Sequence, residues 1–583
     1  MNENNVMAQP ETPVTPPTPP AAPPAPAKSG GIPKAVWLVG CGCLALLVCV
    51  ALVAVLAWFL LPRLMGGGDP ISAVVPGNAV AYVNIDLVKA QSDNVNKIGS
   101  ALQQAAKTGK NETSLEMANR IMNDEYGMSF ADDVLPWIGQ YAAVVLTEAD
   151  FKSGNSKYML IVESRDGAKA DAFIDKFTAA AESKKGTSFT KREQDGITLH
   201  THTGASIKDT MVIARNGNFV YLANTEDAIT TSAKLKNGDS LASTQAYKDA
   251  MAALPADRIA SAYVSADVYQ KYYESLGSTL PSSPALMSGL AGLEGLGASL
   301  SAKSVGLQMD MAIAYDKDKI SQFQKDNLAV KYTNPTVDKL LPDDTFLYIG
   351  INSTQNFGKY LQKDNPAYTK DVQESLDLFE KQYGVSLQKL LGLLSGEFAI
   401  AAGPATDGML PEVGKIKAGV TIIASTSDEN GFDSWFKDLL AGLSKNMKLT
   451  ADTKDVTLGN YALQSLTVQQ GLGYESPVLY YGADKGYIVL GTSKLSLEKG
   501  LGGKGTLAGS ATYTNTWKAF PSGSVPYMYV DIAKVVDFIK TGTNTSSFDT
   551  TVWEKLPVFA ATINKASGYI QSYTFILFVT TTK

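Results

Sequence analysis

The second half of this chain repeats the first, and this repeat limits the possible folds more than any other feature. The segment around Tyr82 (AYVNID) returns around Tyr348 (LYIGIN), 266 residues later. Tyr263 returns as Tyr529 at the same spacing. Matches that keep their order at a nearly constant offset indicate two copies of one unit, with insertions in loops. We therefore expect two similar domains, at residues 70–329 and 330–583.

Each copy carries the signals of an antiparallel sheet. Val80–Val83 is β-prone and apolar on both faces, as buried strands are. The dipeptides Asp195-Gly196 and Asn216-Gly217 favour tight hairpins. Residues 168–183 predict a helix that is apolar on one side, which would cover a sheet. We therefore predict two tandem α+β domains, each an antiparallel sheet with helices mainly on one face.

Four acidic or amide residues follow predicted strands where a helix is expected to begin: Asp86, Asp267, Asn352 and Asp531. A side-chain oxygen at that position accepts a hydrogen bond from a free backbone N–H, which contributes about 1 kcal/mol. We interpret these residues as helix N-caps rather than as catalytic acids.

An uncharged apolar run, Ala35–Leu61, precedes the repeat. As a helix it would be roughly 40 Å long, more than the ~30 Å hydrocarbon core of a bilayer. The run is too long for a cleaved signal peptide. Lipid attachment at Cys41 is disfavoured because the apolar stretch follows that cysteine. The fold prediction therefore begins with one N-terminal transmembrane helix at 35–62, between a disordered proline-rich tail at 1–34 and a glycine-rich linker at 63–69.

The charges and thiols around the apolar run predict the orientation of the chain. Lys28 and Lys34 precede the run and Arg63 follows it, which favours a cytoplasmic tail. All three cysteines lie inside the run: Cys41, Cys43 and Cys49. A large region without thiols suits an oxidising compartment. We expect a single-pass protein of the cell membrane, with its tail in the cytoplasm and its C-terminal domains outside, in the cell envelope.

Composition restricts the partners. Residues 9–27 are rich in proline and favour extended polyproline II, either as a spacer or as a docking segment for an aromatic-lined groove. The net charge of −6 and the content of only six arginines give no general attraction for nucleic acid. The expected partners are the membrane, through Ala35–Leu61, and an envelope protein or lipid ligand. The oligomeric state stays open.

Short elements of the type P-x-D-x-x-x-Y-V-x-x-D carry a resemblance. They surround Tyr82 and Tyr348 and recur in Leu254–Asp257 and Leu341–Asp344. On these residues the chain resembles an uncharacterised family of bacterial membrane-anchored proteins, the domain of unknown function 3352. The resemblance covers most of 70–583. It implies a short tail, one transmembrane helix and an outer region, and it supplies no activity and no site residues.

The sequence contains two histidines, His200 and His202, which share a face if they lie in a strand. The second copy has Gln464 and Leu466 at the matching positions, so we interpret the pair as part of a solvated strand face rather than a metal site. No Gly-x-Ser-x-Gly, His-Glu-x-x-His or phosphate-loop pattern occurs. We predict no catalytic, cofactor-binding or metal-binding residues, and no cofactor.

Three further segments have an ordinary interpretation. Gly500–Gly505 resembles a dinucleotide fingerprint, but a helical stretch leads into it, which favours a glycine-rich helix terminus. The acidic pairs Asp132-Asp133 and Asp343-Asp344 are adjacent and do not converge as an acid–base couple. Residues 284–300 keep their leucines at helical spacing, which predicts a thin helix that either packs on a sheet or gates an apolar groove.

A duplicated scaffold without a catalytic constellation favours a binding protein that is not an enzyme. We expect it to bind an envelope partner or an apolar ligand. A structural scaffold or spacer is the alternative, and an enzyme that uses carboxylates alone is a lesser one.

Overall fold

The computed structural model describes residues 69–581, apart from 106–113, 152, 154, 237, 277–291, 353, 355–369, 409–417, 448–449, 470–477 and 543–550. All described residues belong to one compact unit, 50–583. We call residues 70–329 the first repeat and residues 330–583 the second repeat.

The first repeat contributes ten strands: β1 (Ala81–Asp86), β2 (Ile138–Glu148), β3 (Lys157–Ser164), β4 (Thr190–Gln194), β5 (Ile197–His202), β6 (Met211–Asn216), β7 (Phe219–Ala223), β8 (Ala260–Ser265), β9 (Leu293–Lys303) and β10 (Gly306–Tyr315). Its helices are α2 (Asp93–Ala105), α3 (Ser114–Tyr126), α4 (Gly167–Lys185), α5 (Glu226–Ala233), α6 (Gln245–Ala252), α7 (Ala266–Leu276) and α9 (Gln322–Leu328). Short turns of helix include η1 (Ile71–Val74), η2 (Lys89–Gln91) and η3 (Phe130–Val134).

The second repeat contributes β11 (Leu347–Ile351), β12 (Leu394–Pro404), β13 (Ala418–Thr426), β14 (Thr450–Leu458), β15 (Tyr461–Gln469), β16 (Val478–Asp484), β17 (Tyr487–Gly491), β18 (Val525–Asp531), β19 (Val558–Ile563) and β20 (Ile570–Phe578). Its helices are α11 (Lys370–Tyr383), α12 (Leu387–Gly392), α13 (Glu429–Met447), α14 (Lys494–Leu501), α15 (Ala511–Trp517), α16 (Ile532–Gly542) and α17 (Thr551–Glu554), and the short turn η7 (Val337–Lys339) precedes β11.

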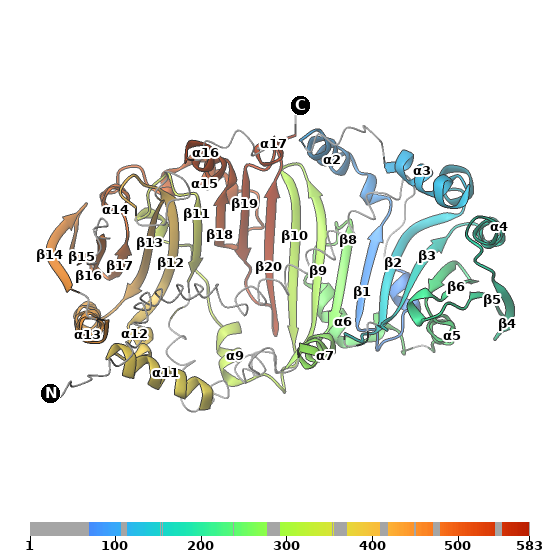
Figure 1. Ribbon diagram of the computed structural model, residues 1–583, viewed down its shortest axis with the longest axis horizontal. Helices are drawn as coiled ribbons and strands as arrows, with labels where there is room; N and C mark the ends of the chain where they lie inside the picture. The colour runs from blue at the N-terminus through green and yellow to red at the C-terminus, as the bar shows by residue number, and fades with distance from the viewer. Residues whose placement is uncertain are drawn as a thin grey trace, which may run out of the picture. The chain divides into compact units, whose positions relative to one another are not determined.

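All described strands form one antiparallel sheet (Figure 1). The first repeat runs β4-β5-β6-β7-β3-β2-β1-β8-β9-β10 across the sheet. The second repeat runs β20-β19-β18-β11-β12-β13-β17-β16-β15-β14. Pairing of β10 with β20 joins them. The strand order of one repeat is therefore the reverse of the other, and the outermost strands are β4 and β14.

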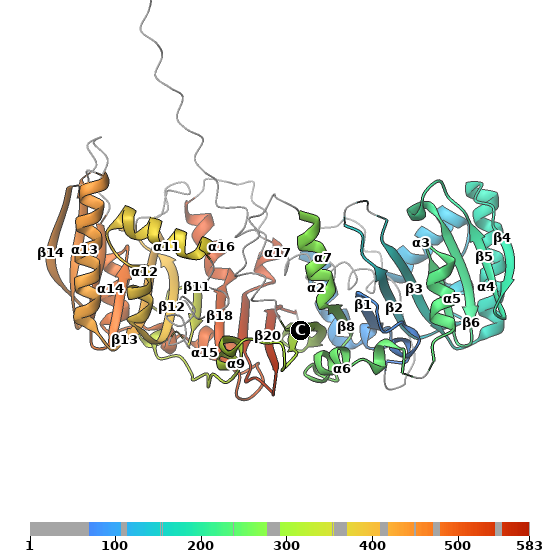
Figure 2. The same cartoon turned by 90° about the horizontal axis from the view of Figure 1, so that it is seen from below.

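The predicted fold class was wrong in its arrangement of sheets. We expected two tandem domains with a sheet each, but β10 and β20 pair along their length and make one sheet of 20 strands. Helices also cover both faces rather than mainly one. Ala143 and Val145 of β2 pack in the same core as α6, whereas Ala142 packs on the opposite face with α4. Figure 2 shows helices on the two sides of the sheet.

The predicted transmembrane helix, Ala35–Leu61, lies outside the described residues, as do the proline-rich tail and most of the linker. In the part of the chain that the structure describes, no helix is long and apolar enough to cross a membrane. The N-terminal transmembrane helix of the predicted fold class, and the descriptions single-pass and signal-anchor that depend on it, are therefore not shown.

The interpretation of 284–300 as a helix was also wrong where it can be checked. Residues 277–291 lie outside the described part, and the remainder opens strand β9. The small residues serve a close approach in this strand: a Cβ added to Gly297 would lie 2.7 Å from the carbonyl oxygen of Ala250 on α6. The helical spacing of the leucines was therefore misleading. The glycine at position 297 belongs to strand β9 and allows helix α6 to approach that strand closely.

The N-cap prediction holds at one of its four positions: Asp531 precedes α16 and accepts a hydrogen bond from the backbone N–H of Lys534 at 3.0 Å. Asp86 accepts hydrogen bonds from the backbone N–H groups of Val88 and Lys89 at 3.0 Å each, but the N-cap position of η2 is Val88. Asp267 instead lies inside the first turn of α7, exposed. Asn352 follows β11, and the helix expected after it lies outside the described residues.

A pseudo-twofold axis passes between β10 and β20. Tyr263, Gly297 and Ala312 are paired across β8, β9 and β10, as Tyr529, Ala560 and Ile576 are across β18, β19 and β20. Asp310 lies two residues before Ala312, and Thr574 lies two residues before Ile576. Asp310 and Thr574 are paired with each other. Equivalent positions of the two repeats therefore meet at the axis.

The axis carries a buried carboxylate. Asp310 is 5% exposed and accepts hydrogen bonds from Thr574 Oγ1 at 2.7 Å and from Gln308 Nε2 at 2.9 Å. Burial raises the pKa of Asp310, and the two hydrogen bonds oppose that shift. A buried carboxylate needs hydrogen-bond donors. Since the observed register of β10 on β20 places Thr574 beside Asp310, this register is more stable than a shifted one.

Thr574→Val removes one donor from Asp310 and should lower the free energy of unfolding by about 1–3 kcal/mol, because the carboxylate stays buried. Urea denaturation at pH 7 measures the loss. Thr562→Val is the matched control: this threonine is equally buried on the adjacent strand but donates to no carboxylate, so we expect less than about 1 kcal/mol. Equal losses in both variants would contradict the role of the Asp310 contact.

Candidate functional site

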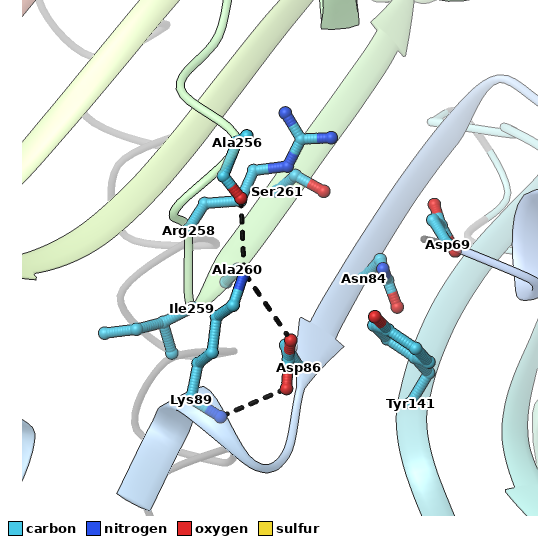
Figure 3. Close-up of a pocket in the computed structure, with 10 residues that line it drawn as sticks. All are labelled: Asp69, Asn84, Asp86, Lys89, Tyr141, Ala256, Arg258, Ile259, Ala260 and Ser261. Carbon is cyan, nitrogen blue, oxygen red and sulfur yellow. Dashed lines mark hydrogen bonds and ion pairs between the residues drawn. The ribbon is translucent and has the colours of Figure 1, made fainter. Parts of the chain in front are cut away.

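A polar pocket of about 220 Å³ lies in the first repeat, where β1, β2 and β8 run side by side (Figure 3). Its walls come from these strands, the loop before β8, η2 and Asp69, which is the first described residue. The lining residues are Asp69, Asn84, Asp86, Lys89, Tyr141, Ala256, Arg258, Ile259, Ala260 and Ser261.

Strand alternation explains why polar groups gather here. Tyr82, Asn84 and Asp86 alternate along β1 and therefore share one face. Asn84 is paired with Ser261 on β8, and Asp86 with Tyr141 on β2. Tyr82 lies inside the apolar core, so the strand passes from an apolar environment into a polar one within four residues.

Asp69 joins the pocket to the core through two tyrosines. Tyr82 Oη donates to its Oδ1 at 2.7 Å, and Tyr247 Oη donates to its Oδ2 at 2.9 Å. The backbone N–H of Ser72 donates to Oδ1 at 3.3 Å. Burial and the Asp69 charge raise the pKa values of both tyrosines. We call Asp69, Tyr82 and Tyr247 the tyrosine latch of the first repeat.

Asp86 and Lys89 form the opposite wall. Lys89 Nζ lies 3.8 Å from Asp86 Oδ2 and donates to the carbonyl oxygen of Ala256 at 3.2 Å. Gln140 Nε2 donates to the same carboxylate at 3.1 Å. Asp86 is 6% exposed, so these partners offset the cost of its burial. This wall is internally satisfied.

Two groups of the pocket are not satisfied. Asn84 is 5% exposed, and its Oδ1 accepts no hydrogen bond in the described part of the chain. Arg258 donates to the carbonyl oxygen of Pro255 at 3.3 Å, and no described carboxylate lies within 4.0 Å of its guanidinium group. A buried acceptor without a donor and an arginine without an anion both face the same cavity (Figure 3). Such groups are suited to a bound molecule.

Tyr141 has a limited chemical role. Burial, and then the charge of Asp86, raise the pKa of Tyr141 to about 12. The phenol therefore stays protonated at neutral pH and is no general base.

The second repeat builds the same strands without this pocket chemistry. At the equivalent positions Asn84 is replaced by Gly350, Tyr141 by Glu397, Arg258 by Ser524 and Ser261 by Tyr527. The fold therefore does not require the polar groups of the first repeat, since β11, β12 and β18 pair in the same way without them.

A related cluster exists in the second repeat, but its carboxylate has moved. Asp338 of η7 is buried close to Tyr348 and Tyr513, which correspond to Tyr82 and Tyr247. Asp338 Oδ1 and the two hydroxyl groups make no hydrogen bond of good geometry among the described residues. The hydroxyl group of Tyr513 nevertheless lies close enough to Asp338 to interact with its carboxyl group. Glu397 instead holds the turn, accepting from the backbone N–H of Thr336 at 2.8 Å. Burial raises the pKa of Asp338 to about 6.

The residues considered from the sequence lie elsewhere. His200 and His202 are on β5, and His200 is 8% exposed rather than on a solvated face; burial lowers its pKa. Among the described residues no group of three or more His, Cys, Asp or Glu side chains could hold a metal.

The other two motifs have structural roles. Gly500–Gly505 begins in the last turn of α14 and continues past its C-cap residue, Gly502, so its interpretation as a helix terminus is confirmed. Asp133 accepts from Lys176 Nζ at 2.6 Å, while Asp343 and Asp344 both pair with Lys499. The structure brings neither acidic pair into the pocket.

Sequence reasoning missed Asn84, Arg258 and Asp69. A signal was available for Arg258: all six arginines precede residue 259, so the second repeat has none. A comparison of the repeats position by position would have marked it as a difference. Asp69 gave no such signal, because its tyrosine partners are separated from it by 13 and 178 residues.

The two tyrosine clusters predict losses of different size for the same Tyr→Phe substitution. Tyr247→Phe should lower the free energy of unfolding by about 1.5–3 kcal/mol, because it removes a donor to a carboxylate. Tyr513→Phe should cost less than Tyr247→Phe, because its hydroxyl group meets Asp338 and Trp517 without a hydrogen bond of good geometry. Urea denaturation of both variants checks the difference, and similar losses would contradict it.

Asp338 predicts a pH dependence. Because its pKa is raised in the folded state, folding binds a proton between about pH 4 and 6, and its contribution to stability decreases as pH rises through that window. Asp338→Asn removes this loss. From pH 4 to pH 8 the variant should gain about 2–3 kcal/mol of unfolding free energy relative to the wild type. A difference between Asp338→Asn and the wild type that stays constant from pH 4 to pH 8 would refute the assignment.

Comparisons with known proteins give a family and no activity. No curated protein matches the chain. The solved structures of crystal forms I and III of TP0453 share 9% identity with it, at TM-scores of 0.22 and 0.23, and cover 44% of this chain and 82% and 83% of that chain; likeness at this level carries no argument. The model of the family described as "Protein of unknown function (DUF3352)" matches residues 41–575. The resemblance noted from the Tyr82 and Tyr348 elements is thereby confirmed, and the chain belongs to the DUF3352 family.

Proposed function

We propose that this protein is a non-catalytic binding protein whose first repeat takes a small polar ligand in the pocket between Asn84 and Arg258. The observation that carries the proposal is the difference between the repeats. The first keeps an unpaired arginine, Arg258, and an unpaired buried acceptor, Asn84, in one cavity, whereas the second has Ser524 and Gly350 at these two positions. Since the strands form without these groups, their presence favours a role in binding.

The chemistry of the pocket supports binding rather than catalysis. Tyr141 stays protonated, and Asp86 is held by Lys89 and Gln140. The histidines lie on β5 and do not line the cavity. An activated nucleophile needs an adjacent base, and the pocket offers no such pair among its lining residues.

We also propose that the domain works outside the cytoplasm, within the cell envelope. The absence of cysteine after Cys49 supports this location, because an exposed domain without thiols tolerates an oxidising compartment.

A second candidate ligand is apolar. Along β10 the side chains of Leu307, Met309, Met311 and Ile313 share one face and are only partly buried. Phe575 of β20 is paired with Met309 and stacks on Phe559 of β19, with ring centroids 6.3 Å apart. This central apolar face favours an apolar molecule as an alternative to the polar ligand of the pocket.

Native mass spectrometry of the purified full chain tests these alternatives. A small polar molecule bound at one per chain is expected. Ala256→Trp, on the exposed rim of the pocket, should abolish that occupancy by filling the entrance. Ser522→Trp, at the matching position of the second repeat, should leave it unchanged.

Other outcomes would overturn the proposal. A co-purifying lipid that survives Ala256→Trp would support the apolar face instead. A partner protein in fixed stoichiometry, with no small molecule bound and none taken up from a metabolite mixture, would favour a scaffold.

A further inference from the structure

We propose that the pocket ligand is a small zwitterion, an α-amino acid or a close analogue, with its carboxylate on Arg258 and its ammonium group at Asn84 and Asp69. This inference rests on the proposed function and names its ligand class. It is argued from the two ends of the pocket and from its size.

The carboxylate end is provided by Arg258. The guanidinium group has five N–H donors in a planar fork that matches a carboxylate. Here one donor is used, on the carbonyl oxygen of Pro255, and no described carboxylate neutralises the charge. Two other described arginines are paired with carboxylates, since Arg215 pairs with Asp171 at 2.7 Å and Arg192 pairs with Glu226. Arg165 donates to the carbonyl oxygens of Leu135 and Pro136 and lies outside the pocket lining. Arg258 is therefore available for an anion from outside the chain.

The ammonium end is provided by Asn84 and Asp69. Asn84 Oδ1 is an acceptor without a donor and is enclosed by the strands around it. Asp69 is held by neutral tyrosine hydroxyl groups, and no described lysine or arginine lies within 4.0 Å of it. Its negative charge is therefore unneutralised beside the free acceptor. A group that donates hydrogen bonds and carries a positive charge satisfies both residues.

The two ends lie on different walls. Arg258 comes from the loop before β8, whereas Asn84 comes from β1 and Asp69 from the segment before η1 (Figure 3). The remaining charges, Asp86 and Lys89, are paired with each other. One unpaired positive and one unpaired negative group across a cavity match a molecule with both charges better than a simple anion or cation.

The size of the cavity limits the ligand. A volume of about 220 Å³ corresponds to roughly seven water molecules at ~30 Å³ each. Glycine, alanine and serine fit within this volume, and longer side chains fit as well. The charges of the lining, and not its volume, therefore select the backbone group that amino acids share.

Isothermal titration of the full chain with glycine, L-alanine and L-serine tests the inference, with lactate and ethylamine as probes that lack one charge. We expect at least one amino acid to bind, and lactate and ethylamine to bind at least about 10-fold more weakly, because each leaves one half-buried charge of the pocket, Asp69 or Arg258, unpaired. Arg258→Ser and Asn84→Gly copy the second repeat and so suit the fold; each should weaken binding about 10-fold or more. Arg192→Met, on the β4 edge, is the control and should not change affinity.

The outcomes separate this inference from the proposed function. If lactate binds as tightly as the amino acids, or if Arg258→Ser leaves affinity unchanged, the zwitterion assignment is wrong although a binding site remains. If the probes do not bind while native mass spectrometry finds another small molecule that Ala256→Trp displaces, the ligand class is again wrong and the site stands. If nothing binds in either experiment, both proposals fall.

Discussion

The pairing of β10 with β20 is the interaction on which this structure depends. It turns two ten-stranded units into one sheet and removes the two edges that would otherwise remain exposed. The buried Asp310 at the centre restricts that pairing, because a shift by one residue would turn the carboxylate to the other face and away from Thr574. The main-chain hydrogen bonds between β10 and β20 would form in several registers, whereas the hydrogen bond between Thr574 and Asp310 forms in only one of them.

The repeats have diverged at the start of their first strands while the framework stayed the same. In one repeat Asp69 accepts from two tyrosine hydroxyl groups, and in the other Glu397 anchors the turn while Asp338 is buried without a hydrogen bond on Oδ1. The tyrosines themselves are kept in both. A duplicated framework allows one copy to retain strand pairing while the other acquires polar groups that the fold does not need.

Local pattern predicted much of the fold and little of the site. The helix expected at 168–183 matches α4, and the hairpin signals at Asp195-Gly196 and Asn216-Gly217 lie between paired strands. The continuous sheet was missed because the partner of β10 lies some 260 residues away, and nothing in either strand specifies which edge it meets. The pocket was missed for a similar reason: Asn84 and Arg258 come together when β1 pairs with β8, and Asp69 joins them through its hydrogen bonds with Tyr82 and Tyr247.

The tyrosine latch has a mechanical consequence. The carboxylate of Asp69, which stands before η1, is both a wall of the pocket and an acceptor from the core. A force that pulls Asp69 away from the sheet would be borne first by the hydrogen bonds from Tyr82 and Tyr247. A load applied from outside the fold would thus reach the cavity before it reached any strand of the sheet.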